Sequence, residues 1–506
     1  MVTKAYSVAF LGIEAQEVEV QCSISSGLPA FNIVGLADKA VAESKERIRS
    51  AFYAIGLSLP AKRITINLAP ANIPKEGSHY DLPIALALLA AIDLFPPDEL
   101  HHYIVIGELS LDGSMNPVFG AISAAINAAE TGRNLICPST SGSEAAIIDT
   151  IEVIAPRTLS DVINHLTGKH TIPPPEPAKK SICFPGADLA DIRGQETAKR
   201  ALEIAAAGGH NMLMIGPPGS GKSMMAYRIP SILPPLSPEE SLEVLMIHSL
   251  SGLITDGKIP FHRPYRAPHH SASIAAMVGG GRPTKPGEVT LAHNGVLFLD
   301  ELPEFSPAAL DSLRQPLELG YVTVARAHAR IQYPSRHQLI TAMNPCKCGY
   351  LLDKDRACSK APLCAANYQG RVSGPLFDRI DLHVEMTPLN PIQLTTQTQS
   401  ESSDTIAKRV QKAYDIQQCR CASIKSEVKI RCNAHLTGAI LEAITPPDSD
   451  SLKLLCEAIE KMKLTARGYY RTLRIARTIA DLEGADNICR HHVAEALSFR
   501  YIPPIR

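Results

Sequence analysis

An eight-residue segment, Gly216-Pro-Pro-Gly-Ser-Gly-Lys-Ser223, has the residue types and the spacing of a phosphate-binding loop. It follows an apolar run expected to be a strand and precedes a segment expected to be a helix, which is the context such a loop needs. Its glycines let backbone N–H groups surround phosphate oxygens, Lys222 can neutralise the β- and γ-phosphates, and Ser223 can bind Mg²⁺. The segment predicts an ATP and Mg²⁺ site made of Gly216, Pro217, Pro218, Gly219, Ser220, Gly221, Lys222 and Ser223.

Polar side chains end the next apolar runs along the chain. Asp300 and Glu301 follow the run 295–299, where Asp300 would hold Mg²⁺ through water and Glu301 would polarise an attacking water. The alternative is that both residues cap the next segment. Asn344 follows a third run and could position that water, although it could instead be a turn residue before Pro345.

Four cysteines lie within nineteen residues: Cys346, Cys348, Cys358 and Cys364. Thiolates in such a group can close a tetrahedral structural Zn²⁺ site, which predicts a zinc-binding insertion at 346–364. The C-x-C and C-x5-C spacings differ from the commoner C-x2-C pairs, so free or redox thiols are the alternative.

Three segments have the composition of a nucleic-acid contact. The first is 320–330, which alternates with period two and would place Arg326, His328 and Arg330 on one strand face. The second is the glycine-rich stretch 277–281, preceded by His269 and His270, two residues we interpret as structural. The third is the acid-free stretch 461–477, whose arginines would share a helix face. For the first and the third segment, the alternative is a solvated strand or helix face.

The elements that position these residues fall into blocks. The 506 residues suggest about three domains, and Lys+Arg 50 against Asp+Glu 51 excludes a protein that coats nucleic acid by bulk attraction. We expect an α+β domain at 1–170, a Pro-rich linker at 171–180, an α/β core at 181–390 and a helical block at 391–506. A secretion signal and a long apolar span are absent from the sequence, so we expect a cytoplasmic protein with no membrane segment.

Together these motifs resemble the YifB/ComM family of magnesium-chelatase-like AAA+ ATPases. The resemblance covers essentially the whole chain, and it is carried by the phosphate-binding loop and by the segments 266–271, 291–302, 344–349 and 374–381. It implies an α/β fold, an AAA+ P-loop core with an α-helical lid, preceded by an α+β Lon-protease-like (S5-like) domain.

The resemblance also implies roles for single residues. Asn344 would be sensor 1, Arg379 the arginine finger that reaches a neighbouring subunit's ATP, and Arg467 sensor 2. Gln195 would lie beside the adenine, or simply start a helix. The alternatives are an ion pair of Arg379 with Asp378 or Asp381, and a surface role for Arg467.

The function that follows from the resemblance is an ATP-dependent DNA motor. It would be a ring-forming helicase, an ATP-dependent homo-hexamer, that acts on single-stranded and branched DNA and promotes branch migration in homologous recombination and natural transformation. The alternative is a protein-remodelling or magnesium-chelatase-type ATPase without DNA activity, whose pore would use an aromatic such as Tyr265 or Tyr321. Segment 74–83 resembles the Lon nucleophile region but has Asp81 and Leu82 there, with Ser78 shifted, so we predict no peptidase activity.

Overall fold

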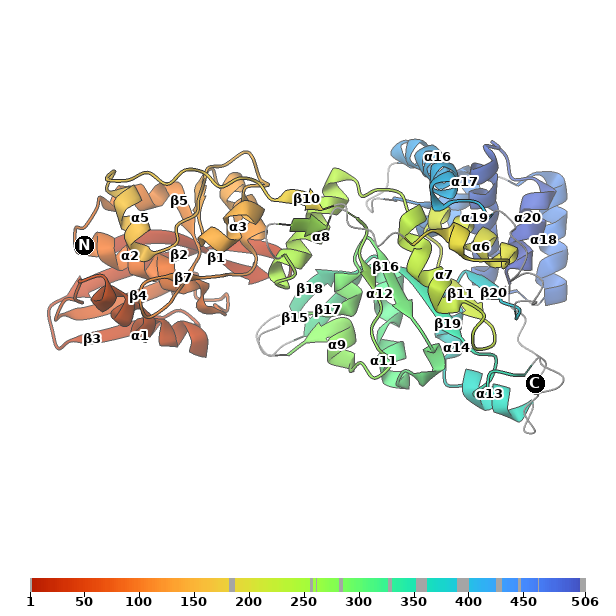
Figure 1. The fold of residues 1–506 in the computed structure, drawn as a ribbon, viewed down its shortest axis with the longest axis horizontal. Helices are drawn as coiled ribbons and strands as arrows, with labels where there is room; N and C mark the ends of the chain where they lie inside the picture. The colour runs from red at the N-terminus through yellow and green to blue at the C-terminus, as the bar shows by residue number, and fades with distance from the viewer. Residues whose placement is uncertain are drawn as a thin grey trace.

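The computed structural model describes residues 2–181, 187–254, 258–260, 262–281, 285–325, 330–351, 362–388, 400–424, 430–444, 447–462 and 464–500. An N-terminal unit, a central α/β unit and a group of C-terminal helices follow one another along the longest axis of the molecule (Figure 1). Within the described ranges, no helix has the combination of length and apolar character that a membrane span requires.

The N-terminal unit is built on a seven-stranded sheet in the order β3-β4-β2-β1-β5-β8-β9. Its strands are β1 (Val2–Leu11), β2 (Glu14–Ser25), β3 (Ala30–Val34), β4 (Arg63–Ala69), β5 (Tyr103–Val105), β8 (Asn134–Ile136) and β9 (Val153–Ile154). A short hairpin, β6 (Glu108–Leu109) and β7 (Met115–Asn116), lies beside it. Burial alternates along β4, as in a strand with one face buried.

Helices cover this sheet. They are α1 (Lys39–Ala54), α2 (Asp81–Ala91), α3 (Ala121–Glu130), α4 (Ser139–Ala145) and α5 (Leu159–Leu166). The α2 sequence is apolar almost all round, and it is buried from Asp81 to Ala90, as expected for a helix without a polar face. The buried Asp81 carboxylate is compensated by Arg47 of α1, whose Nε lies 2.6 Å away.

The central unit contains a five-stranded parallel sheet in the order β13-β16-β19-β11-β20. The strands are β11 (Met212–Ile215), β13 (Tyr265–Arg266), β16 (Val296–Leu299), β19 (Gln338–Met343) and β20 (Leu382–Glu385). The short strands β11, β16 and β19 are mostly apolar, and all of their residues are buried, as expected for strands covered on both faces. The α/β class that we expected is confirmed.

Helices and small β-pairs surround the central sheet. The helices are α6 (Glu196–Gly208), α7 (Lys222–Arg228), α8 (Pro238–Leu250), α9 (Ile274–Val278), α10 (Glu288–Leu291), α11 (Pro307–Ser312), α12 (Arg314–Leu319), α13 (Leu363–Gln369) and α14 (Gly374–Phe377). The β-pairs are β10 (Lys179–Ser181) with β12 (Lys258–Pro260), β14 (Gly279–Gly280) with β15 (Lys285–Pro286), and β17 (Tyr321–Ala325) with β18 (Arg330–Pro334).

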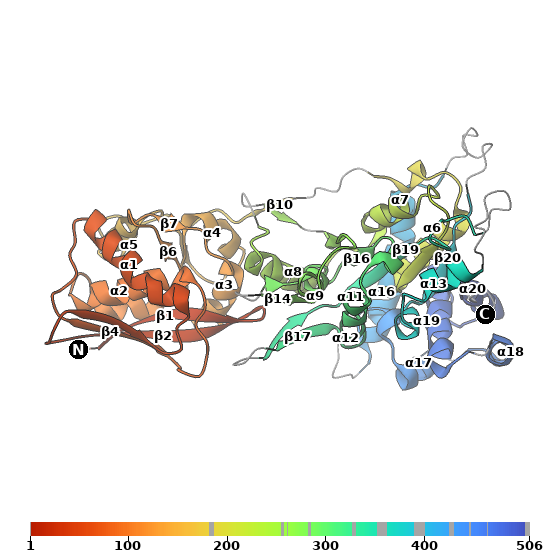
Figure 2. The same ribbon diagram turned by 90° about the horizontal axis from the view of Figure 1, so that it is seen from below.

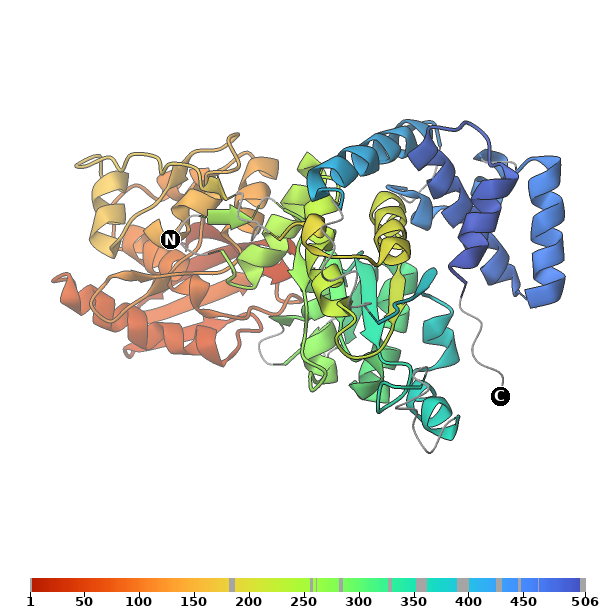
Figure 3. The same ribbon diagram turned by 45° about the vertical axis from the view of Figure 1, so that its right-hand side comes forward.

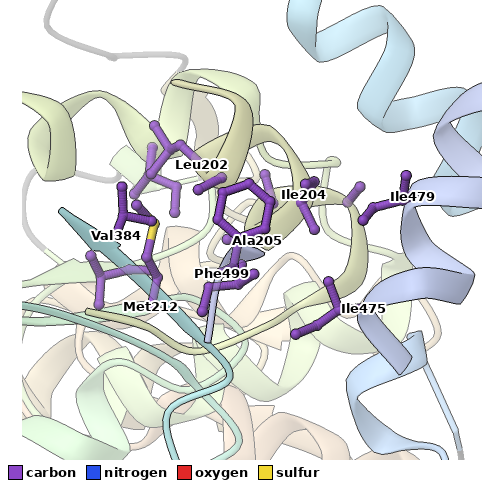
Figure 4. Close-up of a cluster of buried hydrophobic side chains, with 14 of the residues drawn as sticks. Leu202, Ile204, Ala205, Met212, Val384, Ile475, Ile479 and Phe499 are labelled. Carbon is purple, nitrogen blue, oxygen red and sulfur yellow. The ribbon is translucent and has the colours of Figure 1, made fainter. Parts of the chain in front are cut away.

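The C-terminal helices pack on the core through α6. They are α16 (Ser403–Ala422), α17 (Gly438–Ile444), α18 (Ser449–Met462), α19 (Ala466–Glu483) and α20 (Arg490–Ser498). Figure 3 shows α16, in pale blue, running from the core to the other C-terminal helices. Figure 4 shows Leu202 and Ala205 of α6 between the sheet residue Val384 and Ile475 of α19, so one hydrophobic cluster joins core and helices. The domain boundary predicted near 390 falls outside the described residues, as does most of the junction before α16.

Two of the places where the N-terminal unit meets the core lie at the α3–α4 region and at the β1–β2 turn. Ile122 of α3 packs against Leu245 of α8, and the buried Glu144 of α4 accepts a 2.9 Å hydrogen bond from Ser249 of α8. The β1–β2 turn is the second place, because a Cβ added at Gly12 would lie 2.4 Å from the Gln332 carbonyl oxygen of β18. Figure 2 shows β17 extending from the core toward the N-terminal unit.

Candidate nucleotide site and intersubunit arginines

The polar residues predicted for nucleotide chemistry meet at the carboxyl edge of the central sheet. The phosphate-binding loop follows β11, Asn344 follows β19, and Asp300 with Glu301 follows β16. Because β11 and β16 both pair with β19, these strand ends are adjacent. Parallel sheets bind ligands at this edge, so the strand order itself assembles the site.

Lys222 lies at the centre of this arrangement. Its Nζ donates to the carbonyl oxygens of Gly216 and Pro217, both at 2.8 Å, and to Asn344 Oδ1 at 3.2 Å. Burial lowers the pKa of Lys222, while the Asp300 and Glu301 carboxylates act in the opposite direction. A phosphate placed in the loop would supply the anion that this buried ammonium lacks.

Backbone conformation and space both fit a phosphate in the loop. Gly219 and Gly221 have φ +78° and +90°, which favours glycine, and the positions where a Cβ would stand are open. At Gly216 an added Cβ would instead lie 2.6 Å from the Met386 carbonyl oxygen. Glycine at 216 therefore lets the loop pack against Met386, and glycine at 219 and 221 allows its left-handed turns and leaves the space beside them open.

The magnesium ligands predicted from the sequence are in contact with each other. Ser223 Oγ donates a 2.6 Å hydrogen bond to Asp300 Oδ2. A hydroxyl and a carboxylate this close offer the oxygen ligands that Mg²⁺ prefers, with waters and phosphate oxygens to complete its shell. The residues therefore fit the ion that the sequence predicts.

Glu301 occupies the edge beside the Lys222 cluster. Its φ is +51°, a left-handed conformation that costs a non-glycine residue about 1–3 kcal/mol. Its side chain is 53% exposed, and the His270 Nδ1 lies 3.7 Å from Oε2. The sequence indicates only a structural role for His270, and its place beside Glu301 is a finding of the structure.

The Gln195 side chain is hydrogen-bonded to backbone carbonyl groups of the protein. Its φ is +58°, and its Nε2 donates to the Thr387 carbonyl oxygen at 2.7 Å and, at 3.4 Å, to that of Ser220. The side chain therefore links the end of β20 to the phosphate-binding loop. Its position beside an adenine stays a prediction.

Arg379 and Arg467 come together on one carboxylate that the sequence did not indicate. The Glu318 carboxylate of α12 accepts from Arg379 Nη2, and Arg467 Nη2 lies 3.9 Å from Glu318 Oε1. The Arg379 guanidinium lowers the pKa of Glu318. The alternative to an arginine finger was an ion pair of Arg379 with Asp378 or Asp381. In the structure, Arg379 forms its ion pair with Glu318.

These two arginines lie at the opposite edge of the sheet from the phosphate-binding loop. Arg379 precedes β20, the loop follows β11, and the two strands pair in parallel from Met212↔Leu382. Four residues of strand span about 13 Å. The arginines of one chain are therefore positioned away from that chain's own phosphate site.

The arginine-rich stretch 461–477 is exposed at its start, at Lys461 and Arg467, but the face predicted for its arginines is largely buried beyond Arg467. Arg471 is buried with its Nε 3.4 Å from Asp381 Oδ1, and Arg477 is buried against Asp481. Arg474 donates to the Ala434 carbonyl oxygen. The acids that pair with the buried arginines of α19 come from other segments or from its last turn. The absence of acids from the stretch 461–477 therefore did not make its arginines a free positive charge.

The segment 320–330, predicted to place its cations on one strand face, instead turns back on itself between β17 and β18. Ala325 of β17 pairs with Arg330 of β18, so Arg330 lies on the returning strand and does not continue the face of β17. Arg326 and His328 lie outside the described residues. The glycine-rich stretch 277–281 completes α9 and forms β14.

Three of the four predicted zinc ligands converge. The sulfur atoms of Cys346, Cys348 and Cys364 all lie within 4.8 Å of one another, and the first two are 3.1 Å apart. Zn–S bonds of about 2.3 Å place the sulfurs of a tetrahedral site about 3.8 Å apart, so this group fits Zn²⁺ with small adjustments. Cys358 lies outside the described residues.

The Lon-like segment holds its polar side chains in internal contacts. Ser78 donates to Glu108, and the buried Lys75 donates to the Pro70 carbonyl oxygen. Asp81 is fixed by Arg47. The structure thus gives Ser78 a carboxylate partner and not a lysine, while the absence of peptidase activity stays a prediction.

Comparison with known proteins gives the family. The family model described as magnesium chelatase, subunit ChlI, matches residues 188–394, and related models match 18–141 and 400–500. YifB of Salmonella typhimurium is 45% identical over 98% of this chain and 96% of its own length. The chain belongs to the YifB/ComM family.

Two further relatives agree with the fold. The competence protein ComM of Haemophilus influenzae is 42% identical over 98% of the chain and 96% of its own length. Lon protease 2 of Bacillus subtilis is 26% identical over 30% of this chain, consistent with a Lon-like part. Membership of this magnesium-chelatase-like AAA+ family supports an ATPase that uses ATP and Mg²⁺.

Proposed function

We propose that this chain is an ATP-driven DNA motor of the cytoplasm, a ring-forming helicase that promotes branch migration in recombination of incoming DNA. Its phosphate-binding loop and its paired arginines lie at opposite edges of one sheet, and this arrangement carries the proposal. In a ring, the edge that carries Arg379 and Arg467 faces the phosphate edge of the next subunit. Each nucleotide site is then completed by two subunits, as a hexamer requires.

The proposed chemistry follows from the groups at the two edges. Lys222 binds the phosphates, Ser223 and Asp300 hold Mg²⁺, and Glu301 with Asn344 orients the attacking water. Arg379 and Arg467 leave Glu318 and stabilise the charge that develops on the transferred phosphoryl group of the neighbouring subunit's ATP. Glu318 keeps both cations in place when no neighbour is engaged.

DNA is the proposed substrate because of the hairpins and the relative ComM, whose name marks it as a competence protein. Figures 1 and 2 place β14–β15 and β17–β18 on the side of the core toward the N-terminal unit. Lys285 and Arg330 are exposed on these hairpins and offer cations to a phosphate backbone. We propose that the hairpins contact single-stranded and branched DNA inside the ring.

The aromatic residues weighed for a protein-remodelling pore are less suited to that role. Tyr265 stacks on Phe298, with ring centroids 6.3 Å apart, and packs against the core cluster. Tyr321 is partly buried at the start of β17 and lines a cavity of about 790 Å³ between the N-terminal unit and the core. Neither presents an exposed ring to an unfolded chain.

A structural zinc ion is part of the proposal. Cys346, Cys348 and Cys364, with Cys358, would hold it next to Asn344, and the ion would fix the segment that follows β19. Its role is to keep the sensor residue in place and not to take part in hydrolysis.

The test is movement of a labelled four-way junction by the purified protein with ATP, with Glu301→Gln as the control. The proposal expects the wild-type chain to bind and move the junction, and the variant to bind it without moving it. Hydrolysis of ATP without binding or movement of DNA would overturn the motor and leave the alternative ATPase.

A further inference from the structure

Asn211 lies at the edge of the central sheet that is opposite the phosphate-binding loop. It directly precedes β11, and β11 lies between β19 and β20. Its backbone N–H donates to Asp381 Oδ2 at 3.2 Å, and its carbonyl oxygen accepts from the N–H groups of Asp381 and Leu382, both at 3.0 Å. The backbone of Asn211 is therefore tied to the start of β20.

The Asn211 side chain links two further segments beside β11. Its Nδ2 donates a 2.9 Å hydrogen bond to the Arg379 carbonyl oxygen, and its Oδ1 accepts a 2.8 Å bond from the Leu339 N–H of β19. β11 leads to the phosphate-binding loop, and β19 leads to Asn344. One amide group thus connects the main chain of the proposed arginine finger to the two strands that carry nucleotide-binding groups.

The two contacts need opposite hydrogen-bonding groups. A carbonyl oxygen only accepts and a backbone N–H only donates, so the side chain between Arg379 and Leu339 must offer one donor and one acceptor. Asparagine supplies both on one planar amide. An aspartate of the same shape would keep the acceptor for Leu339 but would set an oxygen against the Arg379 carbonyl oxygen. The exchange Asn211→Asp therefore removes one of the two contacts selectively.

The Arg379 side chain has contacts of its own. Nη1 donates to the Pro375 carbonyl oxygen at 2.7 Å, and Nη2 donates to Glu318. Under the proposed function, the guanidinium gives up Glu318 when it meets the neighbour's ATP. The bond from Asn211 holds the main chain of Arg379 and does not depend on where the guanidinium points. It therefore keeps the starting point of the finger fixed, and a displacement of about 1 Å in such a group can cost about 100-fold in rate.

We propose that Asn211 is a positioning residue that sets the main chain of Arg379 for its action on the nucleotide of the neighbouring subunit. The inference rests on the proposed function, because it needs a nucleotide site shared by two subunits. It does not depend on the substrate of the motor, so it applies to ATP hydrolysis measured without DNA.

The first test is steady-state ATP hydrolysis by the full chain with Asn211→Asp. We expect kcat to fall about tenfold and KM for ATP to stay within about twofold of wild type, since the chain's own phosphate-binding loop is unchanged. Asn211→Ala, which also removes the acceptor for Leu339, should lower kcat at least as much and gives the same test if the aspartate disturbs folding.

Thr341→Val is the matched control. It removes a different side-chain bond between β19 and β11, from Thr341 Oγ1 to the Met212 carbonyl oxygen at 3.3 Å, without touching the Arg379 segment. This variant should keep kcat close to the wild-type value. The comparison separates a specific effect on Arg379 from a general weakening of the sheet.

A mixing experiment shows which half of the nucleotide site Asn211 serves. In an equal mixture with Lys222→Ala, half of the Asn211→Asp loops face an intact Arg379, so hydrolysis per Asn211→Asp chain should rise about fivefold. In a mixture with Arg379→Ala, every intact loop faces either no Arg379 or a displaced one, and hydrolysis should not rise. If Asn211 instead served its own loop, the pattern would be reversed, because Arg379→Ala chains would then find an intact finger on their Asn211→Asp neighbours.

The outcomes distinguish this inference from the proposed function. An unchanged kcat in Asn211→Asp, an equal loss in Thr341→Val, or recovery with Arg379→Ala but not with Lys222→Ala overturns the inference. In each of these cases the mixture of Lys222→Ala with Arg379→Ala still recovers if the site is shared, so the inference fails alone. If that mixture also stays inactive, the shared site of the proposed function fails and the inference falls with it.

Discussion

The contact between the N-terminal unit and α8 should depend on pH through one buried carboxyl group. Glu144 is 7% exposed and receives hydrogen bonds from Ser249 Oγ and from the backbone of Ala121. Burial dominates over these bonds and raises the pKa of Glu144 from 4.5 to about 7. The folded state therefore favours the protonated acid, and contact stability falls as pH rises from about 4.5 to about 7.

The size of this effect follows from the two pKa values. Their gap of about 2.5 corresponds to about 3 kcal/mol at 1.36 kcal/mol per pKa unit. About 2 kcal/mol of this loss falls between about pH 5.5 and about pH 8. Glu144→Gln removes the charge at every pH but leaves an amide N–H₂ that costs about 1 kcal/mol when unsatisfied.

The assay is hydrogen exchange of α8, which reports local opening. At about pH 8, the free energy of opening of α8 should be about 2 kcal/mol higher in Glu144→Gln than in the wild type. At about pH 5.5 the difference should be less than about 1 kcal/mol. Comparing the two proteins at the same pH removes the intrinsic pH dependence of exchange. Glu152→Gln, the same change at an exposed residue of this unit, is the matched control. An equal difference at both pH values would refute the reasoning.

Three further predictions concern the ATP site and its neighbours. Lys222→Ala and Arg379→Ala should each abolish ATP hydrolysis. Mixing the two variants should restore part of it, because some interfaces then join an intact phosphate-binding loop to an intact Arg379. A mixture that recovers no activity contradicts a shared site. Gly216→Ala should weaken ATP binding about tenfold or more, since its Cβ would overlap the Met386 carbonyl; unchanged affinity in a titration counts against this. Elemental analysis should find about one zinc per chain, lost in Cys346→Ser and retained in Cys456→Ser, an exposed cysteine outside the group; equal zinc in both contradicts the site.

The local parts of the site could be predicted from the sequence because each motif is fixed by neighbouring residues. Glycine and lysine spacing identifies the loop at 216–223, and apolar runs that end in Asp300 or Asn344 identify strand ends. Parallel pairing then brings such ends together at one edge whatever the details of packing. Helix α2 could be predicted for a similar reason, because a helix that is apolar on all sides must be buried.

The remaining features depend on which distant segments meet. Glu318, Arg379 and Arg467 come from three parts of the chain, and only the folded core brings them into one ion-pair group. Helical spacing correctly placed Arg471 near Arg474. It could not reveal that this face of α19 packs against the segment that carries Asp381. The contact of His270 with Glu301 forms beyond the end of β13, a strand of two residues that has no clear signal in the sequence.

The rate of ATP hydrolysis, measured with a branched DNA and separately with an unfolded protein, tests the central proposal most directly. The account predicts that the DNA stimulates hydrolysis in the wild-type chain, that unfolded protein does not, and that Glu301→Gln is inactive in both. Stimulation by unfolded protein with no response to DNA would contradict it.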